Sequence, residues 1–362
     1  MSSSFDEQDL ALLHVLQISP RISWAEAARV LGSTSTTLSA RWRRLRSEGA
    51  AWVTVNPGRH LAGVTVAFVD LDVAPAERAD VISALCDDSR AATVEESASG
   101  RDLLVTAMVP DQDELTRFTL DDLPALRGVR RVNTRVATGL HWEGSRWRLD
   151  ALDRDQRSML RRGADRNNTD RQGADRQDRA DLALPPRNYG PLVEALTCDG
   201  RRSAADLARI TGRKPATVRR QVARLVASGA VSFRCEIAQL RSRWPYLCTW
   251  FARVPMRELH RTVRSLTTLP GLRLCASVTG DADLVFSLWA SSPGELVELE
   301  RRMSENLPWM SLDESVPQLR VPKRMGWILD SAGRSTGRVV VPGSGSALSP
   351  RDEHDDPPAP SL

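Results

Sequence analysis

The stretch LGSTSTTLSARWRRLRSEGA, residues 31–50, combines an arginine-rich segment with apolar residues at helical spacing. Leu38, Trp42 and Leu45 recur at i, i+4 and i+7, which predicts one buried stripe of an amphipathic helix. The four arginines within Arg41–Arg46 lie off that stripe. This face is either a solvated surface or a surface that meets an acidic partner.

Composition is typical of a multidomain globular protein. The 362 residues are 41% hydrophobic, which is enough for two or more packed domains. The 50 basic and 46 acidic residues leave a net charge of +4, which favours an acidic partner only weakly. No apolar run reaches the roughly 20 residues of a membrane span, and the start MSSSFDEQDL lacks a signal-peptide pattern. We expect a cytoplasmic protein with no membrane partner.

Residues with redox, metal-binding or catalytic chemistry form no recognisable motif. The five cysteines are an odd number without CxxC spacing, which favours reduced core thiols over a disulfide framework or a zinc site. The five histidines are scattered, and no nucleophile is paired with a base. We therefore expect no enzyme activity, no cofactor and no metal.

A second helical pattern precedes the arginine-rich helix. Ser23 is an N-cap for WAEAARVL, Glu26 takes the capping-box position, and Gly32 ends the helix. Together with an apolar stripe further upstream, this predicts three short helices with a glycine turn before the last. That order describes a helix-turn-helix, whose third helix lies in the major groove of double-stranded DNA. The alternative is a helix-turn-helix kept for dimerisation.

The sequence repeats itself after 180 residues. Residues 9–53 align with 189–233 without a gap and match at 13 of 45 positions. Further on, SASGRDLLVTAMV matches SVTGDADLVFSLWA with one residue missing from the first copy. The repeat predicts a tandem duplication. In the second copy, the third helix then begins at Pro215 and ends at Gly229.

Strand patterns follow the helices in each copy. GVTVAFVDLDV alternates as a strand, PAERADVISALC is helical, and AATVEESA and DLLVTAMV are two strands around a turn at Gly100. A helix at about 112–121 and a strand at about 129–138 complete the order βαββαβ, and the second copy repeats it from Tyr246 to Met325. The predicted fold class is α+β, with two copies of a helix-turn-helix (winged-helix-like) domain followed by a ferredoxin-like βαββαβ domain.

The segment between the copies is charged, carries two GADR units and has almost no apolar residues, so we expect a mobile tether. The Gly-, Ser- and Pro-rich end of the chain is expected to be disordered too. The predicted domains are a first helix-turn-helix at 1–59, a first ferredoxin-like domain at 60–148, a linker at 149–188, a second helix-turn-helix at 189–241, a second ferredoxin-like domain at 242–330 and a tail at 331–362.

These residues resemble the leucine-responsive/asparagine-operon (Lrp/AsnC) family. The resemblance is carried by RISWAEAARVLGSTSTTLSARWRRLRSEGA, RRSAADLARITGRKPATVRRQVARLVASGAV and VTGDADLVFSLW. It implies a transcription regulator whose sheet domains pair into oligomers and sense a small molecule, usually an amino acid, near a Gly-x-x-Asp loop. That loop is kept at Gly280–Asp283 and shortened to Gly100–Arg101–Asp102 in the first copy.

Two sets of candidate site residues follow. The candidate DNA-binding residues are Ser35, Thr36, Thr37, Ser39, Arg41, Arg43, Arg44 and Arg46 in the first copy and Lys214, Thr217, Arg219, Arg220, Gln221 and Arg224 in the second. The candidate effector-binding residues are Gly280, Asp281 and Asp283, with Gly100 and Asp102 as their counterparts. Alternatively, this loop has a purely structural role, as a tight turn in which Gly280 adopts a positive φ and Asp283 accepts hydrogen bonds from backbone amides.

Three further expectations concern partners. The two sheet domains pair with each other or with those of a second chain. The two reading helices prefer different half-sites, with more phosphate contact by the first and a sharper guanine preference in the second. Two alternatives to a DNA-binding regulator remain, a sirohaem-decarboxylase-like enzyme on the same fold and a partner that pairs with other family members without binding DNA.

Overall fold

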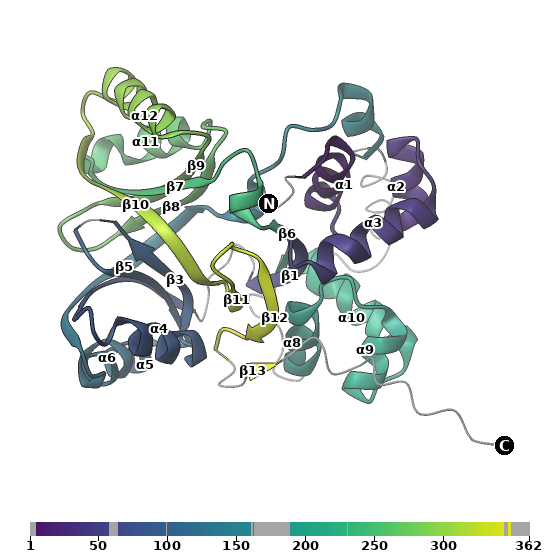
Figure 1. Cartoon of the computed structure of the whole chain (residues 1–362), viewed down its shortest axis with the longest axis horizontal. Helices are drawn as coiled ribbons and strands as arrows, with labels where there is room; N and C mark the ends of the chain where they lie inside the picture. Colours follow the sequence, from purple (N-terminus) through teal and green to yellow (C-terminus); the bar gives the residue numbers. More distant parts are fainter. Residues whose placement is uncertain are drawn as a thin grey trace.

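The computed structural model describes residues 5–57, 64–98, 100–160, 162, 189–229, 231–343 and 347–348. It consists of two helical units on one side and a β-barrel flanked by helices on the other (Figure 1). Among the described residues, no helix is long and apolar enough to cross a bilayer. The predicted boundary between residues 59 and 60 lies outside the described residues.

The first helical unit contains α1 (Glu7–Ile18), α2 (Trp24–Leu31) and α3 (Ser35–Ser47). The predicted capping box of α2 is present, because the Ser23 hydroxyl accepts from Glu26 N and the Glu26 carboxylate accepts from Ser23 N. Gly32 ends α2 in the left-handed conformation, as expected. The predicted stripe of Leu38, Trp42 and Leu45 is buried.

The second helical unit contains α8 (Gly190–Cys198), α9 (Ala204–Thr211) and α10 (Pro215–Ser228). Pro215 is the first residue of α10, and Gly229 ends it with a positive φ, which confirms both predictions. The start of α8 differs from that of α1. Asp6 caps α1 with its side chain, whereas Tyr189 provides no side-chain cap for α8.

A two-stranded antiparallel sheet joins the two helical units. It pairs β1 (Ala51–Pro57) with β6 (Val231–Ile237) along their whole length, from Ala51 opposite Ile237 to Pro57 opposite Val231. Each strand continues directly from the third helix of its own unit. The sheet therefore links the two units through backbone hydrogen bonds.

The remaining strands form the barrel and its extension. The N-terminal half contributes β2 (Thr65–Val73), α4 (Arg78–Asp87), β3 (Ala91–Ser97), β4 (Leu103–Val109), α5 (Gln112–Thr116), a π-helix η1 (Arg117–Asp122), α6 (Leu123–Ala125), β5 (Val129–Trp142) and η2 (Gly144–Arg146). The C-terminal half contributes η5 (Gln239–Arg241), β7 (Tyr246–Arg253), η6 (Met256–Glu258), α11 (Leu259–Leu266), β8 (Leu272–Val278), β9 (Leu284–Ala290), α12 (Pro293–Asn306) and β10 (Ser311–Arg324).

Eight strands close into a barrel, in the order β10-β3-β4-β2-β5-β8-β9-β7 with β7 pairing back to β10. Two seams, β5–β8 and β3–β10, join the halves within one chain, which is the first of the alternatives that the sequence left open. The strands of the two halves therefore form one closed barrel and not two separate sheets. Each of these eight strands therefore has a neighbour on both sides.

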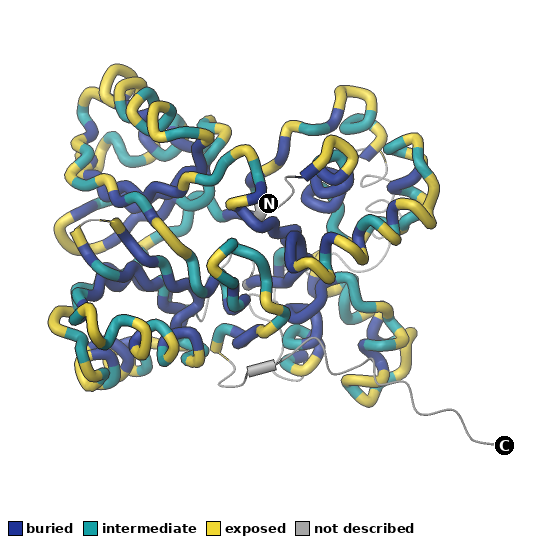
Figure 2. Tube along the Cα trace, viewed as in Figure 1, coloured by how far each residue is buried: buried dark blue, intermediate teal, exposed yellow. Residues whose placement is uncertain are grey.

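Alternation along the strands divides the barrel residues between an inner core and two outer cores. On β2, Phe68 points into the barrel, whereas Val69 and Leu71 pack against α4–α6. On β9, Val285 points inward, and Phe286 packs under α11 and α12. In Figure 2 much of the barrel is dark blue, the colour of buried residues, and the flanking helices are partly yellow. All five cysteines are free and buried, as predicted.

The predicted linker is wrong at its N-terminal end. Leu149, Leu152 and Leu160 are buried in the core of the first helical unit, and residues 154–160 are helical. Leu149 N donates to Gln17 Oε1 (2.7 Å), and Ala151 N donates to His14 Nδ1 (3.2 Å). The few leucines of this segment stabilise it despite its polar composition. Residues 163–188 lie outside the described residues.

The predicted disordered tail is also wrong in part. β11 (Trp327–Leu329) and β12 (Ser335–Val340) extend the sheet beyond β10, and β13 (Ala347–Leu348) pairs with β12. Trp327 packs on Trp52 with ring centroids 5.5 Å apart. Gly49 approaches this hairpin so closely that a Cβ would lie 2.1 Å from Ser335 O. Buried valines on β12 provide the packing that composition alone obscured. Residues 344–346 and 349–362 lie outside the described residues.

Candidate nucleic-acid interface

The N-terminal part of α3 presents small polar side chains to solvent. Ser35, Thr36, Thr37 and Arg43 are exposed, whereas Ser39 is half-buried and donates to Thr36 O (3.0 Å). Thr34 caps the helix by accepting from Thr37 N (3.1 Å). This end of a third helix is the part that contacts base edges in helix-turn-helix proteins.

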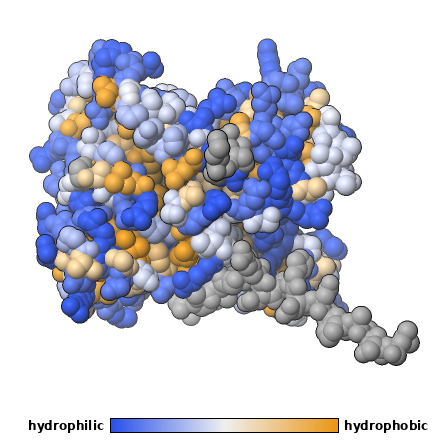
Figure 3. All heavy atoms as spheres, in the orientation of Figure 1, coloured by the Kyte–Doolittle hydropathy of each residue, from blue (hydrophilic) through white to orange (hydrophobic). Residues whose placement is uncertain are grey.

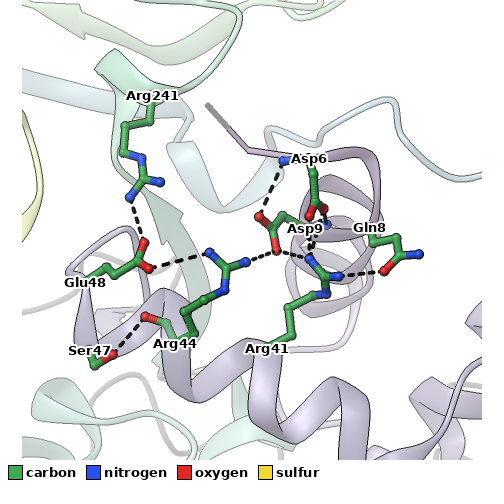
Figure 4. A network of polar contacts seen from close by, with 8 residues as sticks. All are labelled: Asp6, Gln8, Asp9, Arg41, Arg44, Ser47, Glu48 and Arg241. Carbon is green, nitrogen blue, oxygen red and sulfur yellow. Dashed lines mark hydrogen bonds and ion pairs between the residues drawn. The ribbon is translucent and has the colours of Figure 1, made fainter. Parts of the chain in front are cut away.

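Arg41 does not face solvent. Its guanidinium bonds to Asp6 and Asp9 on α1, with an Nη1–Asp9 Oδ1 distance of 2.6 Å, and donates to Gln8 Oε1 (2.6 Å) (Figure 4). Only 17% of the Arg41 side chain is exposed. Despite desolvation, the bonds to Asp9 and Asp6 raise the pKa of Arg41, as expected for a cation held by two carboxylates. Arg41 therefore ties α3 to α1.

Arg44 and Arg46 are also engaged in ion pairs. Arg44 donates to Asp9 (2.6 Å) and lies 3.6 Å from Glu48, with 42% of its side chain exposed. Arg46 bonds to Asp199 of the second helical unit (2.6 Å). Of the four arginines in this helix, Arg43 is therefore the candidate that is exposed and outside these ion pairs.

The N-terminal part of α10 is more cationic at its surface. Lys214, Arg219 and Arg220 are exposed, as is Arg224 on the next turn. Gln221 is half-buried and accepts from Arg213 (2.8 Å), and Thr217 is half-buried. The exposed Lys214, Arg219 and Arg220 contrast with Arg41, Arg44 and Arg46 of α3, which form ion pairs, and the balance of phosphate contacts between the two helices stays a prediction.

Two corresponding arginines bind the helical units to each other. Arg21 donates to Gly200 O and to Arg202 O (3.0 Å), in the turn between α8 and α9. Arg201 donates to Pro20 O (2.6 Å) and Ile22 O (2.9 Å), in the turn between α1 and α2. We call these two contacts the arginine clasp. Sequence reasoning missed the clasp, although the pair was visible as a match in the 180-residue alignment.

The predicted effector loops are tight turns in the structure. Gly100 and Gly280 both have positive φ, 76° and 105°. Asp102 accepts from Val73 N (2.7 Å), and Asp283 accepts from Val254 N (2.9 Å). Both aspartates therefore make the backbone contacts that a purely structural turn requires. A ligand-binding role for these loops stays a prediction.

Asp281 takes part in a buried ion-pair network at the same end of the barrel. Arg135 bonds to Asp281 (2.7 Å) and to Asp70, while Arg101 bonds to Asp70 and Glu314. Both guanidiniums lie over the Phe251 ring, at 4.2 and 4.7 Å. The bond to Arg135 lowers the pKa of Asp281. This network closes the barrel end that is formed by the two loops.

The opposite end of the barrel contains a cavity that sequence reasoning missed. Polar residues from both halves line it, including Asn56 of β1, Glu95 of β3 and Arg324 of β10. Such a site brings together strands far apart in sequence, so only the strand register reveals it. In the space-filling view, the helical units are largely hydrophilic, and apolar atoms gather over the barrel (Figure 3).

Comparison with known proteins agrees with this arrangement. Residues 5–46 match the AsnC-type helix-turn-helix domain. The chain is 30% identical over 139 residues to an uncharacterized HTH-type transcriptional regulator of Pyrococcus abyssi, which covers 37% of this chain and 87% of that protein. A homologous regulator of Pyrococcus horikoshii gives the same identity and coverage.

A solved structure extends the likeness to most of the chain. The siroheme decarboxylase NirDL has a TM-score of 0.55 at 13% identity, covering 88% of this chain and 93% of that chain. The same enzyme in co-complex with an iron-uroporphyrin III analogue has a TM-score of 0.51. At this identity, the likeness concerns the fold.

The site and fold define a helix-turn-helix protein in which two helical units are mounted on one closed β-barrel. The match to the AsnC-type domain and the identity to the Pyrococcus regulators place it more narrowly. The chain belongs to the Lrp/AsnC family of HTH-type transcriptional regulators.

Proposed function

We propose that the chain is a sequence-specific regulator that binds double-stranded DNA through α3 and α10 together. The carrying observation is the rigid connection of the two helical units. The arginine clasp and the β1–β6 sheet hold both reading helices in one arrangement. Two helices at a constant separation read two half-sites at a constant spacing.

We infer that the chain arose by tandem duplication and that its two halves replace the two subunits of a dimer. The barrel seams are the support for this inference. At each seam an arginine of the N-terminal half bonds to a carboxylate of the C-terminal half, Arg135 to Asp281 and Arg101 to Glu314. Pairing of two N-terminal halves would lose both of these carboxylates.

The surfaces of the reading helices support an asymmetric operator. The start of α3 offers hydroxyl groups, which accept several bases, whereas Arg219 and Arg220 of α10 suit guanine. The α10 cations also provide the larger share of phosphate contacts in this proposal, because Arg41, Arg44 and Arg46 are ion-paired.

A gel-shift titration with the gene's own upstream region, followed by footprinting, tests DNA binding. We expect a protected site of two unlike half-sites. Arg220→Ala should weaken binding, whereas Arg131→Ala, an exposed change on β5 beside Asp72, should not. An unshifted upstream region, together with no footprint elsewhere in the genome, would favour a partner protein that does not bind DNA.

We retain the amino acid as the proposed effector near Gly280–Asp283, following the family resemblance. Asp283 already bonds to Val254 N, so a ligand here would have to use the remaining carboxylate oxygen or loop amides. A thermal-shift screen of the common amino acids tests this. A shift that persists unchanged in Asp283→Ala would place the effector elsewhere.

The fold likeness to NirDL favours a second candidate, an enzyme acting on an iron tetrapyrrole. The residues that line the barrel cavity include neither histidine nor tyrosine, so no imidazole or phenol group is available there as an acid or base. Adding iron-uroporphyrin III to the purified chain and recording the Soret band tests this candidate. A shifted band with loss of carboxyl groups would replace the regulator as the proposed function.

A further inference from the structure

The barrel interior is open at the end that faces the helical units. The cavity there has a volume of about 160 Å³, and a single bound water needs only about 10–15 Å³ on the same scale. The space is therefore large enough for a small organic molecule. It is distinct from the Gly280–Asp283 loop, which lies at the opposite end beside the Phe251 network.

One wall of the cavity is apolar. It is formed by inward-facing side chains of β2, β4 and β9, namely Val66, Phe68, Leu104, Met108 and Val285. These side chains belong to the inner core of the barrel and are buried. The wall suits an aliphatic or aromatic body, whose transfer from water is favourable by about 25 cal/mol per Å² of apolar surface.

The other wall is polar, and ion pairs hold part of it together. Arg234 bonds to Glu143 and to Glu236 (3.2 Å), and Arg273 bonds to Glu236 (2.9 Å). The Arg273 guanidinium also lies 4.0 Å from the centre of the Trp289 ring. These contacts hold two cations and two carboxylates in a constant arrangement at the cavity rim.

Three other lining groups have bonding capacity left over. Arg324 Nη2 donates a hydrogen bond to Gln239 Oε1 (3.1 Å), but Arg324 Nη1 is buried without a partner among the described residues. Asn56 is 4% exposed, and its Nδ2 is likewise buried without a partner. A buried donor without a partner is costly, so an acceptor at this place would be stabilised.

Glu95 completes the polar wall. Its carboxylate forms no hydrogen bond or ion pair with a described residue, and Arg324 is the cation that acts on it electrostatically. Burial raises the pKa of Glu95 to about 7. When Glu95 is protonated, the three arginines at the cavity exceed the ionised Glu143 and Glu236 by one positive charge.

We propose that the barrel cavity binds a small carboxylate with an apolar body, with its carboxylate on Arg324 and Asn56 and its body on the Phe68 wall. A guanidinium and an amide are a usual donor pair for a carboxylate, and the surplus positive charge selects an anion. The donors to the ligand are Arg324 Nη1 and Asn56 Nδ2, which lack an acceptor among the described residues, as does Arg234 Nε at the same cavity.

The same site connects the ligand to the helical units. Asn56 belongs to β1 and Arg234 to β6, the two strands that join those units, whereas Arg324 and Phe68 belong to the barrel. A ligand that bridges both would hold the helical units against the barrel. The effect on the helical units matters only if the chain binds DNA, so it rests on the proposed function. Ligand binding itself does not depend on that function.

Isothermal titration calorimetry on the full chain, without DNA, tests the proposal. The probes are 4-methylpentanoate and phenylacetate, each beside its amide, and leucine as the arm that adds an ammonium group. We expect both carboxylates to bind and each amide to bind at least about tenfold more weakly, because the charge-assisted bond is lost. Leucine binding equal to that of 4-methylpentanoate would identify an amino acid as the source of the carboxylate.

Variants locate the binding. Arg324→Met should reduce carboxylate affinity by about tenfold or more, whereas Arg131→Met, an exposed change on β5 that does not line the cavity, should leave it unchanged. If Arg324→Met does not fold, Glu95→Gln is the second variant, and it should bind carboxylates at pH 8 as tightly as wild type does at pH 6. Equal binding of acids and amides, or no binding of any probe at millimolar concentration, would overturn the proposal. Neither result depends on whether the chain binds DNA.

Discussion

Arg135 Nε lies 2.7 Å from Asp281 Oδ1 across the β5–β8 seam of the barrel. At the β3–β10 seam the corresponding ion pair joins Arg101 to Glu314. In both pairs the cation belongs to the N-terminal half and the carboxylate to the C-terminal half. A third pair at the β3–β10 seam, Arg320 with Glu96, has the opposite arrangement, so ion pairs of both polarities join the two halves.

Reversing one of these charges should weaken the barrel. Glu314→Arg would place a second cation beside Arg101, whose side chain is only 3% exposed, at an expected cost of about 2–4 kcal/mol. Urea unfolding measures the loss. Adding Arg101→Glu should restore part of it by re-creating an opposite-charge pair. If the double variant is no more stable than Glu314→Arg alone, the seam charges do not determine the pairing.

The arginine clasp should set the half-site spacing. In Arg21→Ala/Arg201→Ala the turns of the two helical units lose their mutual hydrogen bonds, while the β1–β6 sheet remains. We expect wild type to discriminate sharply between DNA probes that differ by a few base pairs in half-site spacing, and the double variant to discriminate less. Anisotropy titrations over a spacing series measure this. Arg29→Ala, an exposed change on α2, is the matched control and should keep the wild-type profile.

The two reading helices should differ in their response to salt. Arg220→Ala should relax base choice in one half-site and lower the salt slope by about one, as expected for an exposed cation on DNA. Arg41→Ala should instead destabilise the first helical unit and leave the salt slope near that of wild type, because Arg41 bonds to Asp6 and Asp9. A loss of slope in Arg41→Ala equal to that in Arg220→Ala would show that Arg41 leaves α1 on binding.

His14 should make the first helical unit sensitive to acid. Burial lowers the pKa of His14 to about 4, and its Nδ1 accepts from Ala151 N. The unfolded chain takes up this proton near the ordinary pKa of about 6.5, so stability is fully present above that pH and is lost as pH falls towards 4. The full shift corresponds to about 3 kcal/mol.

Thermal unfolding between pH 7.5 and 4.5 measures this loss against two variants. His14→Gln keeps an acceptor for Ala151 N without the titration, and we expect its stability to fall less steeply with acid. His260→Gln, at an exposed site on α11, should follow wild type. Parallel curves for wild type and His14→Gln would assign the acid sensitivity to other groups.

Local patterns predicted the helices well because their signals are local. The capping box at Ser23 and Glu26, the glycine at 32 and the proline at 215 act within one turn of chain, and each does so in the structure. The order of strands and helices in both halves likewise follows from alternation and turn residues.

What sequence could not predict depends on contacts between distant segments. Leu149 and Leu152 lie in a polar stretch, and only the core of the first helical unit gives them a place to pack. Arg41 looked like a DNA contact because it lies off the apolar stripe, but α1 supplies Asp6 and Asp9 on that side. The residues that line the cavity with Arg324 and Glu95 come from strands of both halves, and no periodicity predicts their meeting.

Closure of the barrel within one chain has a genetic consequence. In a symmetric dimer every codon change appears twice in the assembly, so a new interior charge arrives in duplicate. Here Glu95 lies opposite Leu104 on β4, while the corresponding place opposite Val285 on β9 holds Ala276. A single carboxylate can therefore lie in the barrel interior without a second one at the symmetry-related position. Because both halves belong to one chain, one half can carry an interior side chain that the other half lacks.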